Sequence, residues 1–203
     1  MDDHSFRFGD HGRMRLHFLI EQISNMDWQS YLGRLNQHLL AKLDHQELVD
    51  LQEAASIVDY LGYPPATINQ IEETQIRLGF ELPNSLKHFY IASNGWHAAD
   101  GFPVGIANVL PVTELFLLSN CPMRVPEICS DSVEQYFGGL ASENPINRLK
   151  DCVVIIDLDG NELGFAVRTE SLADWPVVTY NPDGDGFEIY DGFVDLMKQG
   201  ETY

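Results

Sequence analysis

The fold is decided by one stretch of sequence, which opens with Gly62-Tyr63-Pro64-Pro65-Ala66-Thr67 and closes with Leu110-Pro111-Val112-Thr113-Glu114. Between these ends lie two amphipathic segments, which are separated by Leu78-Gly79-Phe80-Glu81-Leu82-Pro83 and followed by Asn94-Gly95-Trp96. Proline, glycine and small polar residues mark where helices begin and end. Their order here predicts two short helices joined at a Leu-Pro corner, with extended chain after the second helix.

The first of these helices is predicted from its capping residues. Gly62 stands where a left-handed cap of a preceding helix is expected, and Pro64-Pro65 stops that helix from continuing. Thr67 is then the N-cap of a new helix, with Gln70 as its capping-box partner and Gly79 as its end. The inward face of this helix is predicted to consist of Ile68, Ile71, Gln75 and Leu78.

The second helix is predicted to start at Pro83, which suits the first helical position, and to stop at Asn94-Gly95. Its inward residues are predicted to be Leu86, Phe89 and Tyr90. Short apolar runs then predict strands near Val104 to Ala107 and Val109 to Leu110. Thr113 to Leu118 is predicted to form one or two helical turns.

The clearest strand pattern lies in the second half of the chain. Cys152 to Leu158 is rich in Val and Ile, Asp159-Gly160 is a turn dipeptide, and Glu162 to Arg168 is a second apolar run. Such a sequence is typical of a β-hairpin. Trp175 to Tyr180 and Phe187 to Tyr190 predict a second pair of strands.

Helices are predicted at both ends of the chain. Asp191 can cap a final helix, whose inward residues are Phe193, Leu196 and Met197. Two amphipathic helices are predicted upstream of Gly62, the first of them beginning at Asp27. We therefore expect an α+β fold, with an antiparallel sheet flanked by helices and two extra N-terminal helices.

Three segments are expected along the chain. Residues 1–14 show no usable period and are expected to be a loosely ordered tail. Residues 15–61 hold the N-terminal helices, whose narrow apolar faces require packing on the main domain. Residues 62–203 form that main domain.

The motifs, taken in order, resemble the SUKH superfamily over about residues 57–199. The resemblance is carried by the helix entering at Thr67, Leu82-Pro83, Asn94-Gly95-Trp96, Leu110-Pro111-Val112 and Trp175-Pro176-Val177-Val178. Bacterial members of that superfamily are largely toxin-neutralising immunity proteins, and fungal members regulate cell-wall assembly. The resemblance implies a SUKH-like fold and a binding protein, not an enzyme.

Composition limits the class of partner. The chain has 203 residues, 44% of them hydrophobic, and 31 acidic against 12 basic residues give a net charge of −19. Such a charge repels nucleic-acid phosphates and anionic membranes and favours a basic protein partner. The N-terminus shows no signal peptide, and no segment approaches the about 18 apolar residues of a membrane span, so a cytoplasmic location is expected.

Motifs for cofactors and catalysis are not found in the sequence. Cys121, Cys129 and Cys152 are an odd number without a C-x-x-C pair, so we expect neither a zinc site nor a disulfide framework. The seven histidines lack metal-ligand spacing, and neither a G-x-S-x-G turn nor a phosphate-binding loop occurs. We therefore expect no cofactor, no metal and no enzymatic activity.

Two acidic segments nevertheless allow an alternative. Asn181 to Gly186 matches the opening of a calcium loop, but the twelfth position is Gly192 where glutamate is needed, which favours a polar turn. Asp157 and Asp159 alternate along a predicted strand and, with Glu162, permit a metal-assisted hydrolase. The solvated end of a hairpin is the simpler interpretation.

The leading functional hypothesis is an immunity protein that neutralises a cognate toxin, such as a basic nuclease, by direct binding. Carboxylates would then occupy the basic surface that the toxin presents to its substrate. The alternatives are a regulatory or scaffold protein of the cell-wall-regulator type and a surface that is acidic only for solubility. The expected partner-binding residues are Trp96, His97, Asp100, Asp157, Asp159, Glu162, Asp183, Asp185 and Glu188. For Trp96, packing beneath its own loop is the competing interpretation.

Overall fold

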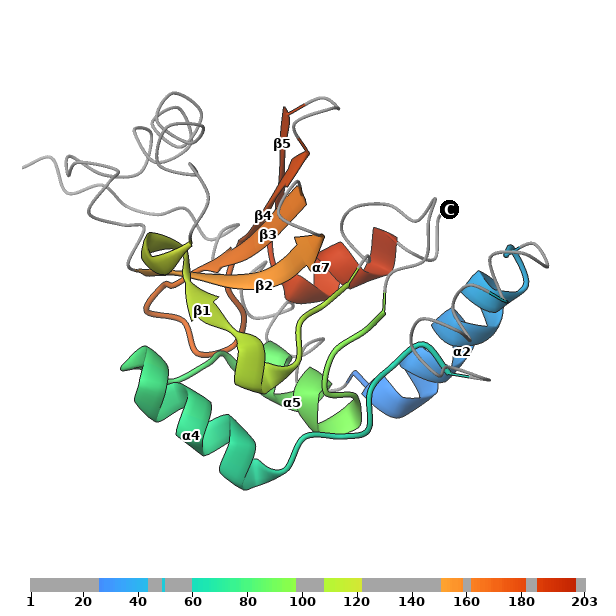
Figure 1. The fold of residues 1–203 in the computed structure, drawn as a ribbon, viewed down its shortest axis with the longest axis horizontal. Coiled ribbons are helices and arrows are strands. Elements are labelled where there is room, and N and C mark those ends of the chain that lie inside the picture. Colours follow the sequence, from blue (N-terminus) through green and yellow to red (C-terminus); the bar gives the residue numbers. More distant parts are fainter. Residues whose placement is uncertain are drawn as a thin grey trace, which may run out of the picture.

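The computed structural model describes residues 26–43, 49, 60–97, 108–121, 151–158, 162–181 and 186–199. The helices in these residues are α2 (Trp28–Leu40), α4 (Ile68–Leu78), α5 (Asn84–Ala92) and α7 (Phe193–Lys198). The strands are β1 (Phe116–Leu117), β2 (Cys152–Leu158), β3 (Glu162–Val167), β4 (Val177–Asn181) and β5 (Gly186–Tyr190). Helices α4 and α5 lie beneath the sheet and α2 extends to one side (Figure 1). The α+β class predicted from the sequence is confirmed.

The five strands form one antiparallel sheet in the order β1-β2-β3-β4-β5. Both predicted hairpins are therefore confirmed. Strand β1 was not expected, because Thr113 to Leu118 was predicted to be helical. Only Val112–Glu114 and Leu118–Asn120 form 3-10 turns there. Phe116 and Leu117, which lie between these two turns, pair with β2. The pairing gives their backbone N–H and C=O groups hydrogen-bond partners, which an isolated turn does not provide.

Helix α4 has the predicted ends but not the predicted face. Thr67 and Gln70 form the capping box, and Gly79 ends the helix in a left-handed conformation, with φ of 84°. The buried residues are Ile71, Thr74 and Leu78, whereas Ile68 lies in the exposed arc of the helix. The prediction that Ile68 faces inward is therefore wrong.

Polar contacts explain how α4 is turned. The Thr74 hydroxyl donates to the carbonyl of Val112 at 3.0 Å, and the Arg77 guanidinium donates to the carbonyls of Leu115 and Thr113 at 2.6 and 3.1 Å. These bonds satisfy carbonyls beside the 3-10 turn and draw the Thr74 side of α4 toward it. Ile68 lies on the other flank of the helix and is left in solvent.

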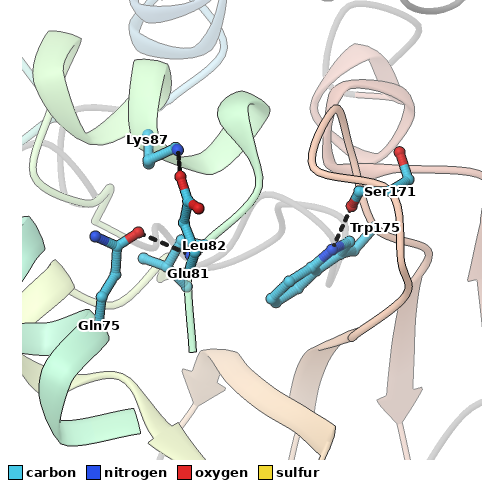
Figure 2. A network of polar contacts seen from close by, with 6 residues as sticks. All are labelled: Gln75, Glu81, Leu82, Lys87, Ser171 and Trp175. Carbon is cyan, nitrogen blue, oxygen red and sulfur yellow. Dashed lines mark hydrogen bonds and ion pairs between the residues drawn. The ribbon is translucent and has the colours of Figure 1, made fainter. Parts of the chain in front are cut away.

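The corner between α4 and α5 is held by side chains (Figure 2). Gln75 Oε1 accepts from the backbone N–H of Leu82 at 2.8 Å, and Lys87 pairs with Glu81 at 2.7 Å. Pro83 is the N-cap of α5, so the helix begins at Asn84, one residue later than predicted, and it ends at Ala92. Its buried side chains include the predicted Leu86, Phe89 and Tyr90.

An aromatic cluster joins three helices in the core. The Phe89 ring of α5 lies 5.5 Å from the Trp28 ring of α2 and 5.0 Å from the Phe193 ring of α7. The Tyr31 hydroxyl donates to the carbonyl of Met197 at 2.6 Å. Asp27, where the first N-terminal helix was predicted to begin, is the N-cap of α2 and accepts from the backbone N–H of Ser30. Helix α2 thus shares one core with α5 and α7. Of the expected second N-terminal helix, Val49 is helical, Leu61 is not, and nearly all the residues between them lie outside the described residues.

Helix α7 is capped by a residue from another part of the chain. Asp191 was predicted as its N-cap, but the helix follows Gly192, which supplies no side chain. The carboxylate of Asp174 takes that role. It accepts from the hydroxyl of Ser85 at 2.5 Å and from the backbone N–H groups of Trp175 at 2.9 Å, Phe193 at 3.2 Å and Val194 at 3.4 Å.

The buried position of Asp174 limits which residue can stand at position 192 and shifts the pKa of the Asp174 carboxyl group. A Cβ on Gly192 would lie 2.2 Å from Asp174 Oδ2, so any other residue there would displace the carboxylate. Burial raises the pKa of Asp174, against the opposing effect of its hydrogen bonds. One partly desolvated carboxylate therefore joins α5, α7 and the start of the chain segment that contains Trp175.

Removing this carboxylate is expected to destabilise the fold. Asp174→Ala leaves several buried donors without an acceptor and should lower the free energy of unfolding by about 2–4 kcal/mol. Asp174→Asn retains one acceptor oxygen and should cost less. Asp191→Ala, at the exposed position, is the control and should change stability by less than about 0.5 kcal/mol. Urea unfolding measures all three, and equal losses in Asp174→Ala and Asp191→Ala would contradict the assignment.

The same residue predicts a pH dependence. Because the pKa of Asp174 is raised in the folded state, the folded protein holds this proton at pH values where the unfolded chain has lost it. The stability of the wild type relative to Asp174→Asn should therefore fall as pH rises from 3.8 through the raised pKa, and stay constant above it. A difference that grows in the opposite direction would contradict the raised pKa.

Candidate functional site

The candidate site lies at one end of the sheet. Because successive strands are antiparallel, the ends of β2 and β4 and the starts of β3 and β5 all lie at that end. Leu158 pairs there with Glu162, and Asn181 pairs with Gly186. Two predicted site residues, Asp157 and Glu162, are thus placed beside this end of the sheet.

A separate chain segment reaches the same end through backbone bridges. Trp96 pairs with Gly62 on one side and Val109 on the other, and Val109 pairs with Ile156 of β2. The Trp96 N–H donates to the Val109 carbonyl at 2.8 Å. The Asn108 side-chain amide donates to the carbonyl of Asp157 at 2.6 Å. The chain around Trp96 is therefore bonded to the last residues of β2, next to the end of the sheet where Asp157 and Glu162 lie.

Trp96 itself has no exposed surface. Its ring makes an edge contact with Tyr60, with ring centroids 5.5 Å apart. The sequence left two interpretations of Trp96, an exposed interface residue or a residue packed beneath its own loop. Its buried position fits the second interpretation, so the side chain is not an exposed anchor for a partner. Its contribution to the site is to hold the backbone of its neighbour His97.

His97 presents a ring at the surface. It stacks on Tyr63 with ring centroids 4.1 Å apart, and the Tyr63 hydroxyl lies 3.4 Å from His97 Nδ1. Partial burial lowers the pKa of His97, so the ring is neutral at neutral pH. Burial raises the pKa of Tyr63, and the charge of Glu114 adds to that rise. The pair is a flat, uncharged surface beside carboxylates, which suits contact with an aromatic or guanidinium group.

Glu188 lies apart from these residues on β5. It pairs in register with Thr179, its side chain is exposed, and its carboxylate accepts from the Tyr190 hydroxyl. Burial and the Glu188 carboxylate together raise the pKa of Tyr190 to about 12. Glu188 therefore extends the acidic surface along the last strand of the sheet.

A comparison with protein-family models finds the SMI1 / KNR4 family (SUKH-1) over residues 65–199. The chain belongs to this family. A comparison with curated proteins gives no match. Members of the family are typically immunity proteins or SMI1-like regulators that bind protein partners, and they are generally non-catalytic. The resemblance read from the caps and corners of the sequence is thereby confirmed.

The family match and the candidate site overlap only in part. The match begins at Pro65, so α2 and Tyr63 precede it. Tyr63 and Asn108 are site residues that sequence reasoning missed. Their signals were weak: Tyr63 stands in Gly-Tyr-Pro-Pro, and Asn108 directly precedes a predicted strand. Asp100, Asp159, Asp183 and Asp185 lie outside the described residues of this SUKH protein.

Metal binding finds no support in the part of the SUKH chain that the structure describes. No group of three His, Cys, Asp or Glu side chains in that part is close enough to hold an ion. The alternatives raised by Asp157 with Asp159 and by the Asn181–Gly186 turn involve residues beyond it. Among the described helices, none combines the length and the apolar character that a membrane crossing needs.

The bridge through Trp96 should depend on Gly95. Gly95 has φ of 112°, and a Cβ there would lie 2.6 Å from the Val109 carbonyl oxygen. Gly95→Ala should therefore lower the free energy of unfolding by more than about 2 kcal/mol. Gly33→Ala is the matched control: its Cβ meets nothing within 4 Å inside α2, so it should stabilise by about 0.5–1 kcal/mol. A harmless Gly95→Ala in thermal or urea unfolding would contradict the strained bridge.

The Tyr63–His97 stack predicts a second pH effect. The pKa of His97 lies below its ordinary value of 6.5 in the folded protein, so the unfolded chain takes up this proton first as pH falls. The stability of the wild type relative to His97→Phe should be constant above pH 6.5 and should fall below it, down to the lowered pKa. Titration of the His97 ring by NMR gives the pKa directly. A value at or above 6.5 would contradict the stacked, partly buried ring.

Proposed function

We propose that this SUKH protein is an immunity protein that neutralises a cognate toxin, a basic nuclease, by direct binding and without catalysis. The observation that carries the proposal is the net charge of −19 together with the placement of Asp157 and Glu162 at one end of the sheet. Family membership supports a role in binding a protein partner.

The inhibitory step is occupation of the toxin's substrate surface. A nuclease binds phosphates through lysines and arginines, and its affinity depends on that basic field. Carboxylates at the sheet end, with Glu188 along β5, compete for the same cations. Asp100, Asp159, Asp183 and Asp185 are proposed to complete this acidic contact set, while Trp96 acts from the core.

His97 supplies a contact of another kind. Its neutral ring, stacked on Tyr63, lies on the segment that the Trp96 bridges attach to β2. A flat aromatic pair is a suitable platform for an arginine of the toxin, since guanidinium groups stack on aromatic faces. The proposed interface therefore combines carboxylates with one aromatic platform.

The proposal is tested by co-expressing the chain with the product of the adjacent gene. Suppression of lethality together with a stoichiometric complex is the expected result. Rescue without a complex would contradict direct neutralisation. A chain that binds endogenous partners and leaves the adjacent product lethal would instead be a regulator or scaffold of the SMI1 type.

The electrostatic part has its own prediction. Neutralising three carboxylates, with Asp157→Asn, Glu162→Gln and Glu188→Gln, should weaken toxin binding about tenfold or more at low salt, and less at high salt. The control is Glu170→Gln, an exposed glutamate in the connection between β3 and β4 at the opposite end of the sheet, which should leave affinity within about twofold. Binding measured by calorimetry that does not vary with salt would remove the electrostatic mechanism.

A further inference from the structure

Helix α4 carries two isoleucine side chains that are largely exposed to solvent. Ile76 is 80% exposed and Ile68 is 64% exposed, although both lie on α4, the one helix in the described residues that has a capping box. Isoleucine is a poorer helix former than Glu, Lys or Ala, so these positions gain nothing from local propensity. Exposed apolar side chains that adjoin one another in a single patch mark interaction sites.

The two isoleucines form one row on the helix surface. Ile68, Glu72 and Ile76 are spaced four residues apart, so they lie next to one another along the exposed arc. The opposite flank carries Thr74 and Arg77, which bond to the 3-10 turn. We call Ile68, Glu72, Glu73 and Ile76 the outer ridge. Nothing in the described part of the chain packs on it.

A third exposed apolar residue lies on the neighbouring helix. Ile91 of α5 is 47% exposed. The backbone N–H of Ala66 donates to the carbonyl of Tyr90 at 2.9 Å, which places the start of α4 beside the end of α5. Ile91 also follows Lys87 by four residues, and Lys87 pairs with Glu81 at the corner between the two helices. Ile91 is therefore a third exposed apolar residue, at the end of α5 that lies near the start of α4.

The charges around the ridge select the kind of partner. Glu72 and Glu73 are exposed, and within the described residues neither makes an ion pair. The nearby cations are engaged, because Arg77 donates to carbonyls and Lys87 pairs with Glu81. The ridge is thus apolar and carries two carboxylates with no ion-pair partner among the described residues.

This combination disfavours several occupants. A second copy would oppose Glu72 and Glu73 with its own acidic residues, and each copy carries a net charge of −19. Anionic membranes and nucleic acids are repelled for the same reason. What remains is a protein surface with an apolar centre and lysines or arginines around it. The capped helix is also preorganised, so little ordering is needed on binding.

We propose that the outer ridge is a second contact surface for the toxin, which it binds through an apolar patch flanked by basic residues. The inference rests on the proposed function in that the same partner would touch both surfaces. The acidic sheet end supplies attraction at long range, and the ridge supplies apolar burial after contact. Each isoleucine should therefore affect the lifetime of the complex more than its rate of formation.

The ridge is tested with the full chain and the product of the adjacent gene. Ile68→Gln with Ile76→Gln should weaken binding about tenfold or more, mainly through faster dissociation. Both residues are exposed, so thermal unfolding should change little. Leu172→Gln is the matched control, because Leu172 is 46% exposed in the connection between β3 and β4. Equal affinity in the ridge variant and the control would overturn the proposal.

A second probe separates the ridge from the proposed function. A synthetic amphipathic helix of leucine and lysine should bind the wild type, lose about tenfold or more in the Ile68→Gln, Ile76→Gln chain, and bind more weakly at low salt to Glu72→Gln, Glu73→Gln. This pattern of peptide binding supports the ridge as a binding surface even if the product of the adjacent gene binds neither the wild type nor the variants. In that case only the assignment of the toxin as the partner fails. Peptide binding that is absent, or equal in all variants, overturns the ridge. So does self-association in sedimentation that Ile76→Gln abolishes, since a second copy would then be the occupant.

Discussion

The pairing of Trp96 with Gly62 and Val109 is the constraint on which the rest of the structure depends. It attaches the helical half of the chain to β2, since Val109 also pairs with Ile156. Trp96 fills the space beneath with no exposed surface. The hydroxyl of Ser93 donates to the carbonyl of Gly95 at 2.8 Å, which fixes the turn that leads into the bridge. This backbone connection holds the chain before α4 and the chain after α5 to the sheet, and the bonds of Thr74, Arg77 and Ser85 complete the attachment of the two helices.

The sequence predicted what neighbouring residues decide and missed what distant residues decide. The Thr67–Gln70 capping box and the left-handed Gly79 are local, and both were read correctly. Gly62 was predicted as a left-handed cap; in the described residues only Gly79 and Gly95 have positive φ among glycines. Glycine is required at position 62 because a Cβ there would lie 2.3 Å from the Oγ of Ser93, a residue 31 positions later in the chain. The cap of α7 by Asp174 was hidden for the same reason.

The residues of the candidate site also differ in whether their position could be predicted from neighbouring residues in the sequence. A hairpin pattern is local, and it was enough to place Asp157 and Glu162 near one end of the sheet. His97 is placed near these two residues by the backbone bridges from Trp96 to Val109 and from Val109 to Ile156. No periodic pattern in the sequence predicts these bridges. The exposure of Ile68 is a third case: a helical wheel places it near the buried arc, and the hydrogen bond of Thr74 to the Val112 carbonyl turns that arc away.

The two proposed surfaces are close enough for one partner. Tyr63 stacks on His97, and five residues later the chain reaches Ile68 at the start of the outer ridge. Even fully extended, five residues span at most about 17 Å. An interface of ordinary size covers about 800 Å² on each protein, which is about 30 Å across. A partner of that size that contacted the aromatic pair would also reach the first turn of α4. Charge at the sheet end and apolar burial on the helix then act in sequence on one partner, the first speeding encounter and the second slowing release.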